Sequence, residues 1–524
     1  MRIHNITIWK YLNEKRIYVL IISVLTAFAF FLRIYKLDSS SIWIDEAIRL
    51  SMALNSKHIF PAMTGNSIYI CVILKLLANL TSGNVWDLRL FSVICGCVVV
   101  PLTYVLTANF CRRFYAFLAA GLIAVSPVLI VYSQEMAHYM LATVLVLVQA
   151  VIFIRWIRSY SCLYGALFGA VSLILSDILP QSFFLTAGFL LYVVLSTKLQ
   201  KPNEKKSFIL CVLLFLPAIL SFVWGITFVS MLADYSGGGF FATYVSPSKI
   251  FGRIMTGIFN IPNLNSGYSP RAPLRDIASL LETHIRIVFA SLLAIAAVWA
   301  LFQRKSVVRP ISIALIIFLF GTAFGVMASN QYFERYFIAV QPLAVVIFIA
   351  FISGVIRRFP VTKAPLIMLL VLIMFSWGII TKKSAYGVVW KPPNKEAFEA
   401  IIKDIRNTDE AYCIVPCFSE WPIADYYLRN NSKIVLLGGV FESFRANLRP
   451  SLASLQLTKK DRLQLTLQQI KTLKDSKKNN IFLYTQRGRV MIPALKEEME
   501  QDYEDELLYN EKALIVIKFK LKTN

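Results

Sequence analysis

Charged residues are scarce in this sequence. They make up 16% of its 524 residues, while 57% are hydrophobic, whereas a soluble globular chain has roughly 25% charged residues. From Ile17 to about Thr381 the apolar residues form blocks long enough to span a bilayer, and such blocks are absent beyond Thr381. The composition therefore excludes an ordinary soluble protein and indicates a multi-pass membrane domain followed by a soluble domain.

Acidic residues are especially few: 30 Asp and Glu stand against 54 Lys and Arg, for a formal net charge of +24 at pH 7. A basic chain can bind nucleic acid. Here, however, the basic residues cluster in short stretches between apolar blocks, where they orient a membrane protein. Beyond Thr381 the balance is nearer even, with 24 Lys and Arg against 18 Asp and Glu. We therefore expect a lipid bilayer and no nucleic acid as partner.

Two further signals are missing. No small-residue cleavage site follows the first apolar run, so this run is predicted to be an uncleaved span and not a signal peptide. No glycine-rich phosphate loop follows any predicted strand of the C-terminal part, so nothing supports a nucleotide site there. Cys413 and Cys417 have a spacing that permits a disulfide in an oxidising compartment, but a single such pair does not require one.

The placement of charge between the apolar blocks predicts a topology. We expect about eleven transmembrane helices. They lie at about residues 17–35, 88–110, 114–131, 139–154, 161–176, 181–197, 208–230, 285–302, 310–328, 336–355 and 364–380. With a cytoplasmic N-terminus every predicted inner turn is basic, whereas the short outer turns carry a single basic residue, Arg335. An odd number of spans places the C-terminal part outside, which fits a bacterial inner membrane with a periplasmic or extracellular tail.

The chain is predicted to form two domains. Residues 1–383 are expected to be an α-helical polytopic membrane domain with outer loops at 38–88 and 231–283, and residues 384–524 a soluble α/β domain on the non-cytoplasmic side. Periodicity predicts helices at 42–54, 395–406, 423–429 and 463–473, and strands at 411–415, 434–437, 481–484 and 513–519. The apolar stretch 68–80 is too short to span. Glycines 237–239 suit a mobile loop over a site, and equally an idle connector.

Ionisable residues near the predicted span ends gather on the outer side. They are Asp45, Glu46, Glu135, His138, Asp177, Glu334 and Arg335. Charge inside a bilayer is costly, so this placement indicates a polar cavity facing the outer leaflet, although outer turns are also polar without a function. A carboxylate such as Asp45 can act as a general base or hold a divalent cation, and an arginine can bind a phosphate. This chemistry suggests a lipid-linked phosphate donor and a hydroxyl acceptor.

Four stretches of sequence carry a family resemblance. They are IWIDEA at 42–47, DLRLFSVICG at 87–96, SPVLIVYSQEMAHYML at 126–141 and FERYFIAVQPL at 333–343. In this order they resemble the GT-C superfamily of polyprenyl-phosphate-sugar-dependent glycosyltransferases. The closest likeness is to bacterial relatives of protein O-mannosyltransferases and of the aminoarabinose transferase acting on lipid A. The resemblance covers roughly the first 380 residues and implies a membrane glycosyltransferase of unspecified substrate.

The resemblance also implies roles for individual residues. Asp45 matches the acidic residue taken as the catalytic carboxylate of the family, and Glu46 completes that motif. Arg335 and Tyr336 match an Arg-Tyr pair at which a phosphate contact is expected. The other matches to substrate-site motifs are Tyr132, Gln134, Glu135 and Tyr139, and those to positions taken as mainly structural are Arg89 and Ser92.

Two departures from the family pattern affect donor-phosphate recognition. Relatives often carry His-Pro-Pro in the first outer loop, where this chain has residues 64–67 (TGNS). Relatives also commonly have arginine two residues after the Gln-Glu, where this chain has Ala137 followed by His138. Lys57 and His58 are candidates to compensate, although an interfacial lysine more often only extends its charge into water. These departures are compatible with an altered donor or with a weakly active paralogue.

The mechanism that the resemblance implies is inverting sugar transfer. Arg335 would neutralise the leaving phosphate while Asp45 accepts the proton of an acceptor hydroxyl on a glycan, a lipid or a protein. The predicted site residues are compatible with one cofactor, a divalent cation bound by Asp45. Two alternatives remain: a transporter or flippase of lipid-linked sugars, which would place ionisable residues deep within spans and often repeat its halves, and a catalytically silent paralogue.

Overall fold

The computed structural model resolves the chain into two compact units, each of which is described by itself. The described residues are 2–37, 41–42, 46–47, 49–50, 68–81, 84–196, 205–216, 218–220, 223, 291–303, 308–329, 334–363, 365–367, 394–405, 410–415, 421–428, 431–437, 467–468, 470–486, 491–500, 502–511 and 514–522. The helical unit comprises Met1–Leu37, Arg89–Ser230 and Ala242–Val388, and the sheet unit comprises Asp38–Leu88, Met231–Phe241 and Val389–Asn524. The predicted first outer loop, 38–88, thus groups with the C-terminal part of the chain.

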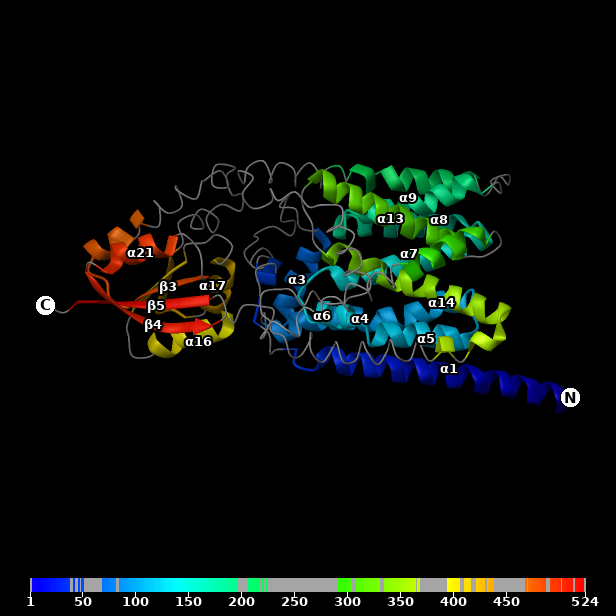
Figure 1. Ribbon diagram of the computed structural model, residues 1–524, viewed down its shortest axis with the longest axis horizontal. Helices are drawn as coiled ribbons and strands as arrows, with labels where there is room; N and C mark the ends of the chain where they lie inside the picture. The colour runs from blue at the N-terminus through cyan, green and yellow to red at the C-terminus, as the bar shows by residue number, and fades with distance from the viewer. Residues whose placement is uncertain are drawn as a thin grey trace. The chain divides into compact units, whose positions relative to one another are not determined.

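The helices of the helical unit run alongside one another in successive layers, with α1 along one side and α8 and α9 along the opposite side (Figure 1). Their bounds are α1 (Arg2–Ile34), α4 (Val85–Ala108), α5 (Arg113–Ala124), α6 (Pro127–Ser133), α7 (Tyr139–Ser159), α8 (Cys162–Ile178), α9 (Ser182–Leu195), α13 (Val308–Ser329), η1 (Glu334–Val340), α14 (Gln341–Arg358) and η2 (Pro360–Thr362). Residues 205–216 and 291–302 are helical as well.

Several of these helices can cross a membrane by length and composition. Among the described residues there are four, and five if a bent pair is one span. The four are Arg16–Ile34, Val85–Ala108, Tyr139–Ser159 and Phe337–Arg358. Other predicted spans fall on shorter apolar helices or outside the described residues, so the number of about eleven stays a prediction.

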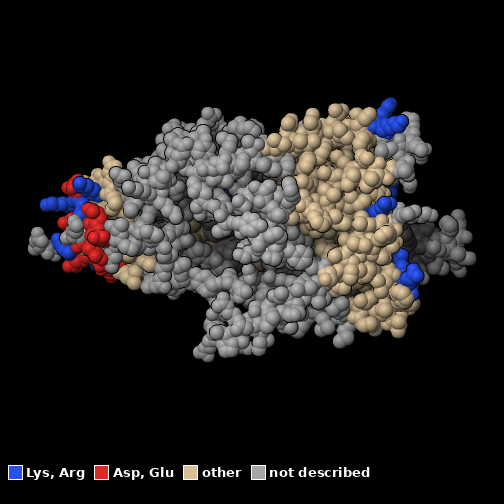
Figure 2. Space-filling model, turned by 45° about the horizontal axis from the view of Figure 1, so that its top comes forward, with Lys and Arg blue, Asp and Glu red and all other residues tan. Residues whose placement is uncertain are grey.

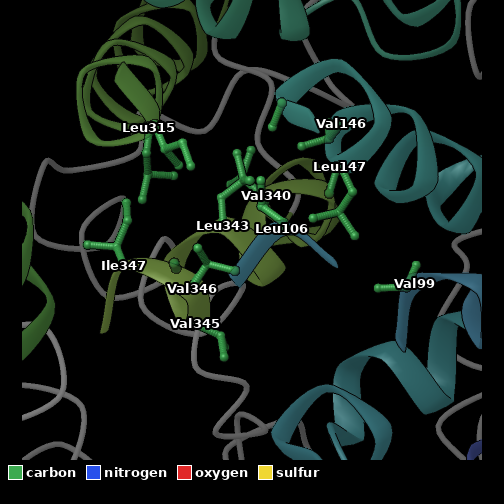
Figure 3. Close-up of a cluster of buried hydrophobic side chains, with 14 of the residues drawn as sticks. Val99, Leu106, Val146, Leu147, Leu315, Val340, Leu343, Val345, Val346 and Ile347 are labelled. Atoms are coloured by element: carbon green, nitrogen blue, oxygen red, sulfur yellow. The ribbon is translucent and has the colours of Figure 1, made fainter. Parts of the chain in front are cut away.

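The core of the helical unit forms around α14. Within the apolar stretch Phe337–Arg358, which includes all of α14, 72% of an 18-residue window is buried, whereas the share is only 11% within Arg16–Ile34 of α1. Figure 3 shows Val340, Leu343 and Val346 surrounded by aliphatic side chains of neighbouring helices. The exposed apolar side chains of α1, by contrast, are suited to contact with lipid tails. The protein is therefore a membrane protein in which α14 is central and α1 peripheral.

The predicted span at 114–131 is bent in the structure. The structure breaks it at residues 125–126, and α5 and α6 are bent by 53° relative to each other. Pro127 is the first residue of α6, and Ser126 before it adopts an extended conformation. Proline has no N–H to continue the α5 hydrogen-bond ladder and disfavours a helical residue before it. The break leaves carbonyl groups at the end of α5 that need other donors.

Basic side chains gather at one end of the helical unit, as Figure 2 shows. The exposed residues that contribute are Arg112, Arg113, Arg155, Arg158, Lys205, Lys206, Arg357, Arg358 and Lys363. The described parts of the turns that carry them contain no Asp or Glu. Arg158 joins two of these turns because its guanidinium donates to the side chain of Asn109 over 2.7 Å and to its carbonyl over 3.0 Å. The described parts of the inner turns expected from the sequence are thus found together at one end of the helical unit.

The sheet unit contains a five-stranded mixed sheet in the order β2-β1-β3-β5-β4. The strands are β1 (Ala411–Ile414), β2 (Ile434–Leu437), β3 (Ile481–Gln486), β4 (Tyr503–Glu511) and β5 (Leu514–Leu521). The first three pair in parallel, and β5 runs antiparallel to both β3 and β4. Helices of the unit include α3 (Ile68–Thr81), α16 (Asn394–Asp404), α17 (Trp421–Leu428) and α21 (Met491–Glu500), and residues 470–475 are helical as well.

Most described elements of the sheet unit lie where the sequence predicts them. This holds for β1, β2, β3, β5, α16 and α17. The sequence analysis missed β4 and α21. The β4 strand, YEDELLYNE, is rich in residues that disfavour strands. It forms at the sheet edge, where its carboxylates face lysines of β5, as in the 2.9 Å ion pair between Glu506 and Lys520.

Candidate functional site

The segment between α6 and α7 carries the predicted motif residues Tyr132 to Tyr139, and it is tied to the end of α1. Gln134 closes α6, and its side-chain amide donates to the carbonyls of Arg33 over 3.0 Å and Tyr35 over 2.8 Å. The last carbonyls of a helix have no partner within that helix, so Gln134 satisfies two groups that α1 leaves open. Gln134, which the sequence predicts to be a substrate-binding residue, therefore makes hydrogen bonds that hold the end of α1 against the end of α6.

Arg33 makes the second connection between these segments. Its side chain is fully buried, and its guanidinium donates to the carbonyls of Ile123 (3.3 Å) and Ala124 (3.0 Å) at the break after α5. These carbonyls lost their helical donors where the chain turns at Pro127. Arg33 also donates to the hydroxyl of Ser133 over 3.2 Å. One guanidinium thus joins α1, the end of α5 and the end of α6.

The second motif, which opens α4, contacts the same region. Arg89 is fully buried and donates to the carbonyl of Leu37 over 2.9 Å, just beyond α1. Ser92 donates to the carbonyl of Ala137 over 3.3 Å, between α6 and α7. Both residues bind backbone groups, which agrees with the mainly structural role expected of them.

The fourth motif reaches the same region through Gln341. The hydroxyl of Ser126, at the break between α5 and α6, donates to the side-chain carbonyl of Gln341 over 3.0 Å, and both residues are fully buried. Gln341 begins α14 directly after the 3-10 helix η1, which contains the predicted residues Arg335 and Tyr336. The η1 helix also packs against α7. We call the meeting point of segments 33–37, 89–96, 126–139 and 334–341 the motif junction.

Aromatic and ionisable side chains line the turn before α7. Tyr132 and Tyr139 meet edge to face with ring centroids 5.3 Å apart, and the His138 ring lies 4.3 Å from that of Tyr139. Glu135 is fully buried in the same turn. The structure thus brings together all the predicted site residues of this motif, although their contact with a substrate stays a prediction.

The structure describes the remaining predicted site residues only in part. Glu46 is helical and fully buried in the sheet unit. Asp45, Lys57 and residues 64–67 lie outside the described residues, as do the side chains of Arg335 and Tyr336 and the whole loop 231–283. Asp177 is half-buried at the end of α8. In the part of the chain that the structure describes, no group of three or more His, Cys, Asp or Glu could hold a metal ion.

Comparison with known proteins identifies the fold. No protein-family model and no curated protein matches the sequence. Solved structures do: ArnT from Cupriavidus metallidurans in the apo state has a TM-score of 0.54 at 9% identity, over 97% of this chain and 98% of that one. ArnT bound to undecaprenyl phosphate gives 0.51 at 12% identity, over 95% and 97%. The Archaeoglobus fulgidus oligosaccharyltransferase, tethered to an acceptor peptide containing the NVT sequon, gives 0.52 at 12% identity, over 97% and 74%. The chain has the GT-C fold.

The GT-C fold expected from the four motifs is therefore confirmed, and the structural likeness covers 97% of the chain. Within this GT-C fold the sequence analysis missed Arg33 and the Ser126–Gln341 pair. Arg33 had no recognisable signal, because its partners are backbone carbonyls about ninety residues away in the chain. The Ser-Pro dipeptide at 126–127, by contrast, is a recognisable helix break.

Proposed function

We propose that this protein is a membrane glycosyltransferase that moves a sugar from a polyprenyl-phosphate donor to a hydroxyl acceptor on the outer face of the membrane. The observation that carries the proposal is the motif junction. Segments that are far apart in the chain, and that resemble one glycosyltransferase superfamily, meet there through buried hydrogen bonds. The GT-C neighbours support it, since one is an oligosaccharyltransferase with an acceptor peptide and another is bound to undecaprenyl phosphate.

The proposed reaction uses one carboxylate and one guanidinium. The acceptor oxygen attacks the anomeric carbon of the sugar, a new C–O bond forms, and the bond from that carbon to the phosphate oxygen breaks. The acceptor proton passes to Asp45, and the phosphate leaves with its charge stabilised by Arg335. Attack opposite the leaving group inverts the anomeric configuration. A divalent cation, if bound, would be held by Asp45 and would supply positive charge to the site.

The proposed topology follows the charge map. The basic end of the helical unit faces the cytoplasm because cytoplasmic turns of membrane proteins carry an excess of Lys and Arg. Residues 1–383 form the membrane domain, and residues 384–524 form an α/β domain on the non-cytoplasmic side. Some of the described helices are shorter than the thickness of a bilayer requires. If every apolar block of the sequence crosses the membrane, the chain has about eleven transmembrane spans.

The test is transfer by the purified protein in proteoliposomes. Polyprenyl-phosphate sugars are supplied in the membrane, and extracted envelope lipids, glycans and peptides are supplied as acceptors. We expect transfer by the unaltered protein and loss of transfer by Asp45→Asn and Arg335→Ala in equal amounts of folded protein. Full activity of Asp45→Asn would remove Asp45 from the catalytic role. Movement of the intact donor across the bilayer without transfer would instead establish a flippase. Absence of both transfer and donor movement would indicate a silent paralogue.

A further inference from the structure

Two residues just ahead of the IWIDEA motif carboxylates are fixed within the sheet unit. The backbone N–H of Ile42 donates to the hydroxyl of Tyr427 in α17 over 3.0 Å. The carbonyl of the same residue accepts from the side-chain amide of Asn394 in α16 over 2.9 Å. Ile42 itself is buried, with 1% of its side chain exposed. Both polar groups of one loop residue are thus held by side chains that follow more than 350 positions later.

Ser41 strengthens this attachment. Its hydroxyl accepts from the backbone N–H of Lys395 over 3.0 Å and donates to the carboxylate of Glu396 over 3.2 Å. The first N–H groups of a helix have no partner within the helix, and a serine hydroxyl is a preferred partner for them. Ser41 thus acts as a cap for α16 that comes from a distant part of the chain.

The Asn394 amide is itself held in one orientation. The hydroxyl of Tyr484 in β3 donates to the amide oxygen of Asn394 over 2.7 Å, so the amide nitrogen is directed at Ile42. Phe398 lies between Tyr427 and Tyr484, with its ring centroid 5.3 Å and 4.4 Å from theirs in stacked arrangements. Asn394 is fully buried. The attachment therefore rests on α16, α17 and a strand of the sheet at once.

We propose that Asn394 and Tyr427 are positioning residues for sugar transfer, because they fix the loop segment that supplies Asp45. The inference rests on the function proposed above. Asp45 follows Ile42 by three residues, so its α-carbon is within about 10 Å of the attachment even in a fully extended chain. Catalytic groups must be held within about 0.5 Å of their productive geometry. A misplacement of about 1 Å can lower a rate about 100-fold.

The experiment uses the full-length protein and removes single hydrogen bonds. Asn394→Asp replaces the donor to Ile42 by an oxygen, and Tyr427→Phe removes the acceptor. Tyr503→Phe is the matched control, since its hydroxyl also makes a part-buried hydrogen bond, donating to the carbonyl of Lys478 over 2.8 Å, and does not bond to Ser41 or Ile42. Amide hydrogen exchange of residues 41–50 and the kcat and KM of transfer in proteoliposomes are measured for each.

We expect Asn394→Asp and Tyr427→Phe to speed exchange of the Ile42 amide and to lower kcat about 10- to 100-fold with little change in the donor KM. Exchange in the five strands should not change, and Tyr503→Phe should match the unaltered protein. Faster exchange of Ile42 with an unchanged kcat would overturn the positioning role, and unchanged exchange would overturn the attachment. An inactive unaltered protein would instead overturn the proposed function, and the positioning role with it.

Discussion

The guanidinium of Arg33 donates a hydrogen bond to the hydroxyl of Ser133 over 3.2 Å and joins two segments that are 100 residues apart in the chain. This contact lies at the centre of the motif junction. A buried arginine is costly unless its donors are satisfied, and here backbone carbonyls and a hydroxyl accept from it. The junction therefore depends on one charged side chain that the family motifs do not include.

Replacing Arg33 by methionine should destabilise the helical unit by about 3 kcal/mol. The reason is that the carbonyl of Ala124 would lose its Arg33 donor in a buried region, and an unsatisfied buried group costs roughly 1–3 kcal/mol. The carbonyl of Ile123 would lose Arg33 as well and keep the backbone N–H of Ser126 as donor. The melting temperature of the detergent-solubilised protein measures the change.

Gln149→Leu is the comparison for Arg33→Met. Gln149 is buried, and its amide donates to the hydroxyls of Ser172 and Thr186 over 2.8 Å each. Both hydroxyls keep a bond to a carbonyl of their own helix when Gln149 is lost. We therefore expect a cost of about 0.6–2 kcal/mol for this variant. An equal loss from both variants would contradict the special role of Arg33.

Gly96→Ala should lower the melting temperature, although alanine is favoured over glycine in a helix by about 1 kcal/mol. A Cβ atom at position 96 would lie 2.1 Å from the hydroxyl oxygen of Ser133 and 2.9 Å from Nε of Arg33. Neither buried group can move without losing hydrogen bonds. Adding Ser133→Ala should restore part of the loss, because it removes the closest atom.

The control for Gly96 is Gly165→Ala. A Cβ at position 165 would have its nearest neighbour at 3.4 Å, which a small adjustment accommodates. We expect unchanged or slightly higher stability there. A stabilised Gly96→Ala protein would show that the Arg33–Ser133 contact is looser than the structure has it.

Stability of the sheet unit should fall in acid and in strong alkali and stay level between. Hydrogen bonds with Tyr412 and Lys478 lower the pKa of the exposed Glu410, and hydrogen bonds with Tyr412 and Glu410 raise the pKa of Lys478. The Glu410 contribution is present above its unfolded pKa and is lost as pH falls through the lower folded value. The Lys478 contribution is present below the ordinary lysine pKa and is lost as pH rises through the higher folded value.

Thermal unfolding of the full-length protein between pH 3 and pH 7 checks this. Lys478→Met should lose part of the acid sensitivity of the unaltered protein, because Glu410 then no longer has a folded pKa held low by that amine. The effect is small, since water and salt screen an exposed ion pair. Identical pH profiles would exclude the Glu410–Lys478 pair as a contributor.

The proposed orientation can be read from cysteine labelling. Cys162 is exposed at the start of α8, next to the basic end of the helical unit. In a variant that keeps only this cysteine, a membrane-impermeant maleimide should label inverted vesicles and not intact spheroplasts. A cysteine placed at the exposed position of Asp475 should show the reverse. Burial raises the pKa of Cys413 to about 12, so this thiol should stay unlabelled in the folded protein from either side.

The sequence predicts most local elements because their signals are local. Alternating apolar residues predict β3 and β5, and the long apolar runs predict α4, α7 and α14. The β4 strand is missed because pairing with the lysines of β5 overrides its poor strand propensity. The break between α5 and α6 is missed because apolar length was given more weight than the Ser-Pro dipeptide.

The motif junction could be predicted only in part. Family likeness identifies Gln134 as a site residue and Arg89 and Ser92 as mainly structural positions, but not the backbone groups that they bind. The contacts of Arg33 with Ala124 and of Asn394 with Ile42 join distant segments through main-chain carbonyls. Any residue supplies such a carbonyl, so neither contact leaves a pattern in the sequence.

The central claim is that this protein transfers a sugar from a lipid carrier, with Asp45 as the base. The most direct measurement is mass spectrometry of surface glycans and glycolipids from cells with the gene, without it, and with the gene carrying Asp45→Asn at equal protein level. The account predicts one sugar that is lost on deletion, restored by the unaltered gene and still absent with Asp45→Asn. Identical glycans and glycolipids in all three strains would contradict it.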